Sequence, residues 1–155
     1  MRFPIDVYPH QLEAIYSSLV AITGQDPWDR AFARISQQLT TNPFMREWLE
    51  ERHIIAIKLH ELLSERQRAG YTRMEARDLA DYRLISFAVG VSRTYQGLSL
   101  LGRARLRGML VDGLKSDHGL LALENEITTA THLLSRGFDV EFHDIEAGGG
   151  IDFRS

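Results

Sequence analysis

The chain has 155 residues, of which 44% are apolar and 25% are charged, and this is the composition of one ordinary soluble domain. It contains no cysteine, which excludes a disulfide scaffold, a thiol nucleophile and a thiolate metal site. No apolar run approaches the roughly 18 residues of a membrane-spanning helix, and the N-terminus lacks the apolar core of a signal peptide. We therefore expect a cytoplasmic protein with no membrane partner.

Charge is distributed unevenly along the chain, although the formal net charge is only -3. Residues 117–155 hold eight acidic residues and two arginines, whereas residues 64–107 hold nine arginines and four acidic residues. A basic stretch beside an acidic one is compatible with a nucleic-acid channel that leads to a metal site. It is also compatible with ordinary solvated helix faces.

Residues 1–116 carry apolar side chains at helical spacing, interrupted by helix start and stop signals. Gly24 is placed to end a first helix, and Thr72-x-x-Glu75 forms a capping box for a fourth. Asp26-Pro27 and Asn42-Pro43 are placed to begin the two helices between them. The sequence predicts a helical bundle with short connections, with helices over residues 9–23, 26–39, 43–69, 72–97 and 101–114.

The pattern changes at Ser116-Asp117, where we expect a further helix to begin and to run to Arg136-Gly137. Residues 138–143 alternate strictly between apolar and polar side chains, which predicts a β-strand. Residues 147–150 predict a turn, and a second strand is expected from Ile151.

The expected fold is therefore mainly α within the α+β class, with a helical module over residues 1–116 followed by a helix and a β-hairpin over residues 117–155. A two-stranded hairpin is marginally stable alone and leaves strand edges open. The missing strand could come from another chain, from cover by the helical module, or from residues beyond Ser155. One candidate function is thus a non-enzymatic interaction protein that forms a homo-oligomer or binds a partner through this edge.

Two segments, EITTATHLLSRGFDVEF over residues 126–142 and GGGIDF over residues 148–153, together resemble the opening of the PD-(D/E)XK, or restriction-endonuclease-like, nuclease core. In that superfamily a helix bearing a glutamate precedes a strand, a second strand carries the aspartate of an Ile-Asp-Phe or Pro-Asp-Phe step, and a third supplies Glu-x-Lys. By this resemblance Asp152 is the first metal-binding aspartate. Glu126 is the glutamate of the helix, with Glu124 as the alternative.

The resemblance implies a metal-dependent nuclease that cleaves DNA or RNA phosphodiesters, with Mg²⁺ as cofactor and with Glu126 and Asp152 as catalytic residues and metal ligands. Carboxylate oxygens hold a hard cation, which activates water and neutralises charge developing on the phosphate. No Glu-x-Lys follows Asp152 within the 155 residues, so we expect these residues alone to be inactive. If the native protein continues, that motif is expected roughly ten to twenty-five residues further on.

The same residues also have ordinary interpretations. Asp152 fits an exposed aspartate beside a turn, and Glu124 and Glu126 fit a solvated helix surface. Arg103 and Arg107 lie four apart in the densest basic cluster and share a helix face, so they could bind a nucleic-acid phosphate, but a solubilising surface has the same pattern.

Three further motifs carry less weight. Residues 88–94 are similar to the turn of a helix-turn-helix but lack the aliphatic residue expected after the glycine, so a continuous helix is predicted and a nucleic-acid-binding helix stays a third alternative. Residues 108–116 nearly spell a phosphate-binding loop, with one residue too many before the lysine. Glu50-x-x-His53 matches one of the two Glu-x-x-His motifs of a di-iron site, but the second motif is absent from the sequence. His53 and His60 lie seven residues apart and could share a helix face, but two histidines alone do not make a zinc site.

Overall fold

The computed structural model describes residues 11–70, 78–142, 145 and 151–154. The mainly helical class is confirmed, and none of the helices in these residues is long and apolar enough to cross a membrane. The elements follow in the order α1 (Leu12–Thr23), α2 (Asp26–Thr41), the short 3-10 helix η2 (Pro43–Met45), α3 (Arg46–Arg52), α4 (Ile54–Ala69), α5 (Leu79–Gly97), α6 (Leu100–Lys115), α7 (Leu121–Ser135), β1 (Asp139–Phe142) and β2 (Ile151–Arg154).

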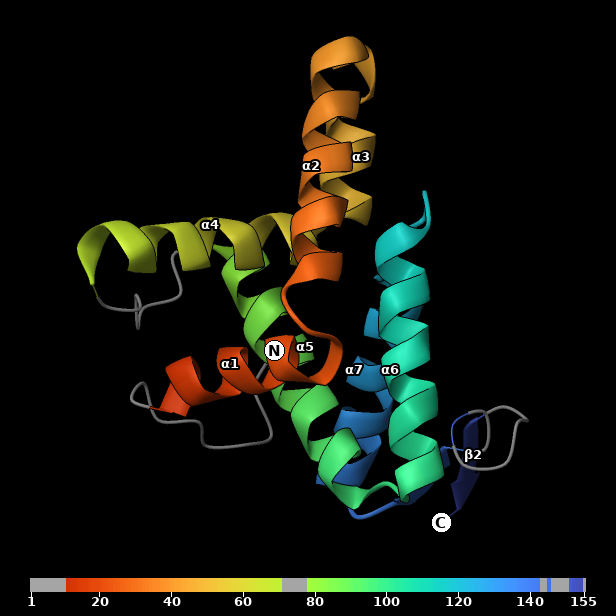
Figure 1. The fold of residues 1–155 in the computed structure, drawn as a ribbon. Coiled ribbons are helices and arrows are strands. Elements are labelled where there is room, and N and C mark those ends of the chain that lie inside the picture. Colours follow the sequence, from red (N-terminus) through yellow and green to blue (C-terminus); the bar gives the residue numbers. More distant parts are fainter. Residues whose placement is uncertain (1–10, 71–77, 143–144, 146–150, 155) are drawn as a thin grey trace.

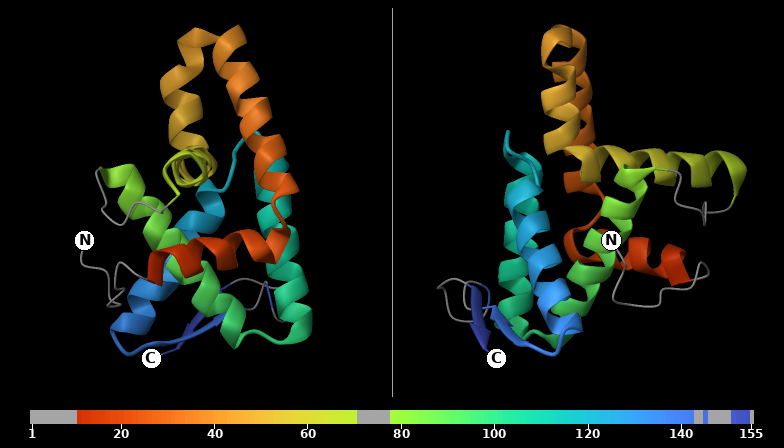
Figure 2. Two further views of the ribbon diagram at one scale, coloured as in Figure 1. Left: turned by 60° about the vertical axis from the view of Figure 1, so that its left-hand side comes forward. Right: turned by 180° about the vertical axis from the view of Figure 1, so that it is seen from behind.

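Helix α5 occupies the middle of the molecule and packs against α1, α4 and α7. Helices α6 and α7 lie side by side, whereas α2 and α3 project from this body as a two-helix arm (Figure 1). The two strands lie at the opposite end of the molecule from the tip of the arm, as both views in Figure 2 show. The strand residues that resemble a nuclease core are therefore remote from the arm.

The hydrophobic core is centred on one face of α5. Leu84, Phe87 and Val91 recur at helical spacing and are fully buried. Gly90 lies between them, and a Cβ at this position would collide with the Ile127 side chain of α7. The glycine therefore permits close contact between α5 and α7, and α5 continues through it, as predicted, without a helix-turn-helix bend.

The prediction of one continuous helix over residues 43–69 is wrong, because the helix is interrupted. The chain forms η2 and α3, breaks at His53, and starts again as α4. His53 has φ -112° and ψ 19°, and its side chain is buried. Apolar spacing continues across the break, so the pattern does not signal it. Because of this break, α3 lies along α2 in the arm, while α4 runs away from the base of the arm in a different direction and packs against α5 (Figure 1).

The helix predicted from Ser116-Asp117 begins instead at Leu121. The residues between α6 and α7 form a tight turn in which Gly119 adopts φ +64°. A Cβ on Gly119 would also collide with the Arg52 carbonyl oxygen and lie 2.8 Å from His53 Nδ1. Both the backbone conformation and the available space therefore require glycine here.

Two helices of the body begin with a polar cap. The Asp78 side chain accepts a hydrogen bond of 2.9 Å from the Asp81 N–H at the start of α5. Ser99 accepts one of 3.0 Å from the Gly102 N–H at the start of α6. The predicted capping box Thr72-x-x-Glu75 lies outside the described residues, as does the predicted turn over residues 147–150.

Strand β1 pairs with β2 in antiparallel register. Glu141 is exposed, whereas its neighbours Val140 and Phe142 are half-buried and Phe142 packs against the core. Helix α7 packs against β1. The register places Asp152 opposite Glu141 and Phe153 opposite Val140.

Candidate functional site

The two carboxylates singled out by the sequence lie on elements that are linked through β1. Glu126 is half-buried on α7, directly before Ile127, which is buried in the core. Helix α7 packs against β1, and β1 pairs with β2, where Asp152 stands opposite Glu141. Packing and register therefore bring both α7 and β2 into contact with β1.

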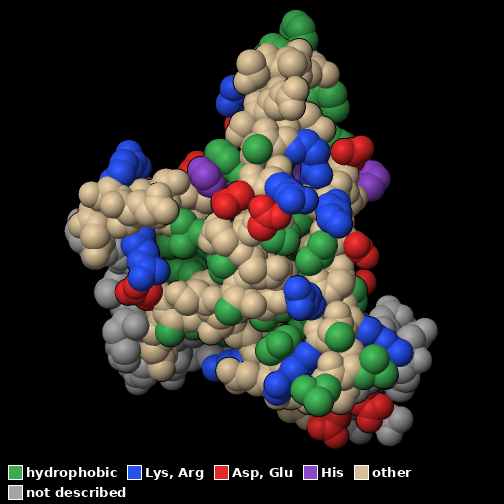
Figure 3. All heavy atoms as spheres, viewed as in Figure 1, with side chains coloured by type: hydrophobic (Ala, Val, Ile, Leu, Met, Phe, Trp, Pro, Cys, Tyr) green, Lys and Arg blue, Asp and Glu red, His purple; other side chains and the backbone are tan. Residues whose placement is uncertain are grey.

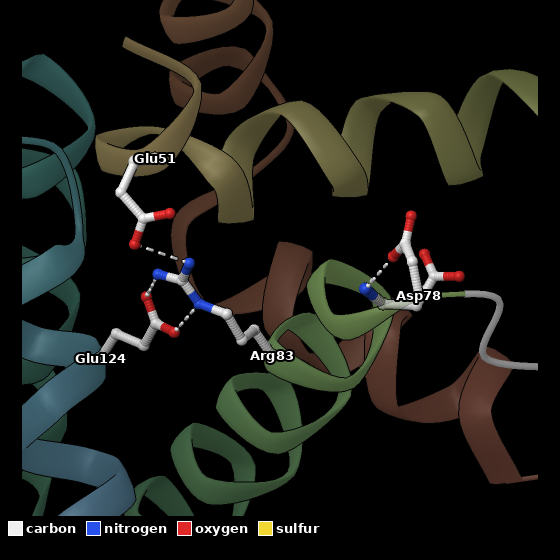
Figure 4. Close-up of polar contacts among 5 residues, drawn as sticks. Glu51, Asp78, Arg83 and Glu124 are labelled. Atoms are coloured by element: carbon white, nitrogen blue, oxygen red, sulfur yellow. Dashed lines mark hydrogen bonds and ion pairs between the residues drawn. The ribbon is translucent and has the colours of Figure 1, made fainter. Parts of the chain in front are cut away.

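Glu124, the alternative helix glutamate, is buried and bound to Arg83 (Figure 4). Arg83 Nε donates to Glu124 Oε1 at 2.8 Å, and Arg83 Nη2 donates to Glu124 Oε2 at 2.9 Å. The expectation that Glu124 belongs to a solvated surface is therefore wrong. Both carboxylate oxygens of Glu124 accept hydrogen bonds from the guanidinium of Arg83, and this bidentate arrangement is the strong form of the interaction.

Arg83 also joins a third helix to this pair. Its Nη1 donates to Glu51 Oε1 of α3 at 3.0 Å. Hydrogen bonding to Glu124 is the main cause that raises the pKa of Arg83, while partial burial opposes it. The network links α3, α5 and α7, and it fixes α7 in the turn that also carries Glu126.

Lys58 on α4 lies among carboxylates of its own helix and of the start of α5. Its Nζ is 3.0 Å from Asp78 Oδ2, 3.4 Å from Glu61 Oε2 and 3.9 Å from Asp81 Oδ1. Burial lowers the pKa of Lys58, but the hydrogen bond to Asp78 and the three acidic neighbours together raise it. Lys58 is therefore a structural cation and cannot serve as a base near neutral pH.

Arg103 and Arg107, the two arginines considered for binding a nucleic-acid phosphate, have different surroundings. Arg103 donates from Nε to the Tyr95 carbonyl at 2.9 Å and from Nη2 to the Gln96 carbonyl at 3.1 Å, so it binds the C-terminal end of α5. Its guanidinium also lies over the Tyr95 ring. Arg107 is exposed. Figure 3 shows Lys and Arg side chains spread over the face of α2 and α6 with acidic side chains among them.

Two arginines to which the sequence assigned no separate role tie distant segments together, namely Arg34 and Arg105, which belongs to the same basic cluster as Arg103 and Arg107. Arg34 of α2 donates to the carbonyls of Leu114 and Lys115 at 2.7 Å and 2.9 Å, at the end of α6. Arg105 of α6 donates to the Ile145 carbonyl at 3.2 Å, which anchors the chain after β1. Their partners are far away in sequence, so no local spacing could have identified them.

His53 and His60 do not form a shared site. His60 stacks on Phe32 with ring centroids 3.5 Å apart and planes inclined by 6°. His53 is buried at the break between α3 and α4, so the two rings do not follow one continuous helix face. The half di-iron spacing Glu50-x-x-His53 likewise crosses the end of α3.

A complete metal site is not formed within the described residues, where no three histidine, aspartate or glutamate side chains gather closely enough to hold an ion. Comparison of the chain with models of protein families, with curated proteins and with solved structures gave no match in any of the three.

Proposed function

We propose that residues 117–154 form the first helix and the strand pair of a restriction-endonuclease-like core, and that the protein acts on nucleic-acid phosphodiesters with a bound divalent cation. The observation that carries the proposal is the order of elements. Helix α7 runs into β1, and β1 pairs with β2, whose Ile151-Asp152-Phe153 step has the family pattern. The packing of α7 on β1 supports it.

Asp152 and Glu126 are chemically suited to hold this cation. Proteins commonly bind Mg²⁺ through one or two carboxylates, with waters and substrate phosphate oxygens as the other ligands. When bound, the ion would polarise the phosphate and activate a water. The contribution of the chain itself is to orient the donors, because the Arg83–Glu124 pair holds the turn of α7 that bears Glu126.

The test is metal binding rather than cleavage, since no Glu-x-Lys follows Asp152 in the 155 residues. Titration of Mn²⁺ followed by calorimetry should give saturable binding to the wild-type protein. Asp152→Asn should abolish it, because the amide removes the negative charge from the implied site. Asp139→Asn removes a charge from the same strand pair, opposite Arg154, and should leave binding intact. Unchanged binding in Asp152→Asn would contradict the proposal.

A second candidate is pairing of this protein with itself through a strand edge. It is favoured by the sheet formed by the described residues, which has two strands and therefore two edges. Sedimentation over a wide concentration range should then show a dimer or larger assembly that Val140→Lys dissociates. A strictly monomeric wild-type protein would exclude this function.

A further inference from the structure

His53 is buried where the arm, the body and the turn between α6 and α7 meet. Its side chain is 4% exposed and lies at the break between α3 and α4. The turn packs directly on its ring, since a Cβ on Gly119 would lie 2.8 Å from His53 Nδ1. The imidazole is therefore held between the base of the arm and residues 116–120.

The two ring nitrogens of His53 have different surroundings. The ring hydrogen-bonds to the backbone of Asp117 in the turn. Its Nε2 is buried without a protein partner, beside a cavity of about 10 Å³ that Arg52, Gly113 and Gly119 help to line. A neutral imidazole leaves a lone pair on one nitrogen, whereas a protonated one places an N–H there that needs an acceptor. Protonation in this packing would create a buried N–H that no protein acceptor satisfies.

The two arginines near His53 also oppose a positive charge on its ring. Arg34 approaches from α2 and Arg52 from α3, while Asp117 is the compensating acid and lies exposed on the turn. Arg34 is fixed by its hydrogen bonds to the last carbonyls of α6. Burial is the largest cause that lowers the pKa of His53 below 6.5, followed by the charge of Arg34, and the hydrogen bond to Asp117 opposes both.

We propose that His53 is an acid-sensitive latch: the neutral ring holds residues 116–120 against the base of the arm, and protonation releases this turn. In the released state the ring reaches water, and its Nε2–H gains an acceptor. The buried orphan nitrogen, the two converging arginines and the close packing of Gly119 carry the proposal together.

The direction of the pH effect follows from proton linkage. The released ring has an ordinary pKa near 6.5 and the latched ring a lower one, so the released state binds more protons between these two values. Well above pH 6.5 both states hold a neutral ring, so the release equilibrium is at its lowest value and does not change with pH. Below pH 6.5, the release equilibrium should rise by up to about tenfold for each pH unit until the pH reaches the pKa of the latched ring.

Hydrogen exchange can measure this release at single amides. The Gly119 and Glu124 N–H groups are hydrogen-bonded in and just after the turn, to Ser116 and Leu120. Their protection factors, which correct for the intrinsic pH dependence of exchange, should be followed from about pH 7.5 to about pH 5.5 in the wild-type protein. Amides of α1 and of the middle of α5 report global unfolding. The variants are His53→Gln and, as a control, His118→Gln, which removes an exposed imidazole from the same turn.

In the wild-type protein and in His118→Gln, protection of the turn should fall by up to about tenfold per pH unit while α1 and α5 stay constant. In His53→Gln the turn should lose this pH dependence. The proposal would be overturned by constant protection of the wild-type turn, by the same fall in His53→Gln, or by an equal fall in α1 and α5. If His53→Gln does not fold, an NMR titration of the wild-type ring decides, since a pKa at or above 6.5 also contradicts the latch.

Discussion

The contact between α5 and α7 and the pairing of β1 with β2 differ sharply in what holds them. The helices meet at the close approach of Gly90 to Ile127 and through the Arg83–Glu124 pair, and between Arg83 and Gly90 the α5 residue Phe87 is fully buried in the core. The strands alternate exposed and half-buried positions along β1, and Phe142 and the Arg105 hydrogen bond to Ile145 connect this region to the body. Asp152, one of the two carboxylates proposed for metal binding, thus lies in the less anchored region, where binding elements are often found.

The largest effect should come from the centre of the helical contact. Phe87→Ala removes a fully buried aromatic ring and should lower the free energy of unfolding by about 3–5 kcal/mol in urea titrations. Leu134→Ala on α7 truncates a half-exposed side chain and should change it by less than about 1 kcal/mol. Similar losses in the two variants would contradict the central position of α5.

The second effect compares two glutamates on one helix. Glu124→Gln leaves the guanidinium of Arg83 without its two-point partner and should cost about 2–3 kcal/mol, discounted for the partial exposure of Arg83. Glu126→Gln should cost less than about 1 kcal/mol, because Glu126 takes no part in this pair and its side chain is half-buried rather than buried. Measuring the free energy of unfolding of both variants tests whether Glu124 is the structural glutamate of α7. A larger loss in Glu126→Gln than in Glu124→Gln would contradict this.

Two glycine substitutions should change stability in opposite directions. Gly90→Ala forces a methyl group against Ile127 and should destabilise the protein by about 1–3 kcal/mol. Gly108→Ala in α6 meets open space, and it should stabilise the helix by about 0.5–1 kcal/mol because alanine has the higher helix propensity. Thermal unfolding of both variants measures the difference, and a stabilising Gly90→Ala would disprove the close contact.

The smallest global effect is expected at the anchor of the strand pair. Arg105→Gln loses the hydrogen bond to the Ile145 carbonyl and should lower the free energy of unfolding by about 0.5–1.5 kcal/mol at most. Hydrogen exchange in β1 should increase more than exchange in α5, because the loss is local. Equal increases in both elements would show that the strand pair is as firmly integrated as the helices.

Local signals in the sequence predicted several elements correctly. Gly24 ends α1 with φ +81°, and Pro27 lies in the first turn of α2, as expected from glycine and proline chemistry. The N-cap of α2 is Gln25 rather than the predicted Asp26, which is the first residue of the helix. The break at His53 and the turn at Gly119 were missed, because each depends on packing against the other and they are far apart in sequence. Periodicity describes one helix face at a time and does not contain such contacts.

The candidate site was predictable only in its residue types. The Ile-Asp-Phe step and the helix glutamate come from the resemblance, but the register that places Asp152 opposite Glu141 comes from strand pairing. The Arg83–Glu124 pair joins residues 41 positions apart on separate helices, so helical spacing within one element could not reveal it. The Arg83–Glu124 pair nevertheless changes the assignment of the site, because it binds both oxygens of Glu124, the alternative helix glutamate.

The most direct test of the nuclease-like arrangement is paramagnetic broadening of amide resonances by substoichiometric Mn²⁺. A metal site shared by the helix and the strand predicts that signals around Glu126 in α7 and around Asp152 in β2 broaden together, and that both recover in Asp152→Asn. Broadening that is confined to other carboxylates, such as the exposed Asp117, or that persists in Asp152→Asn, would contradict a shared metal site between helix and strand.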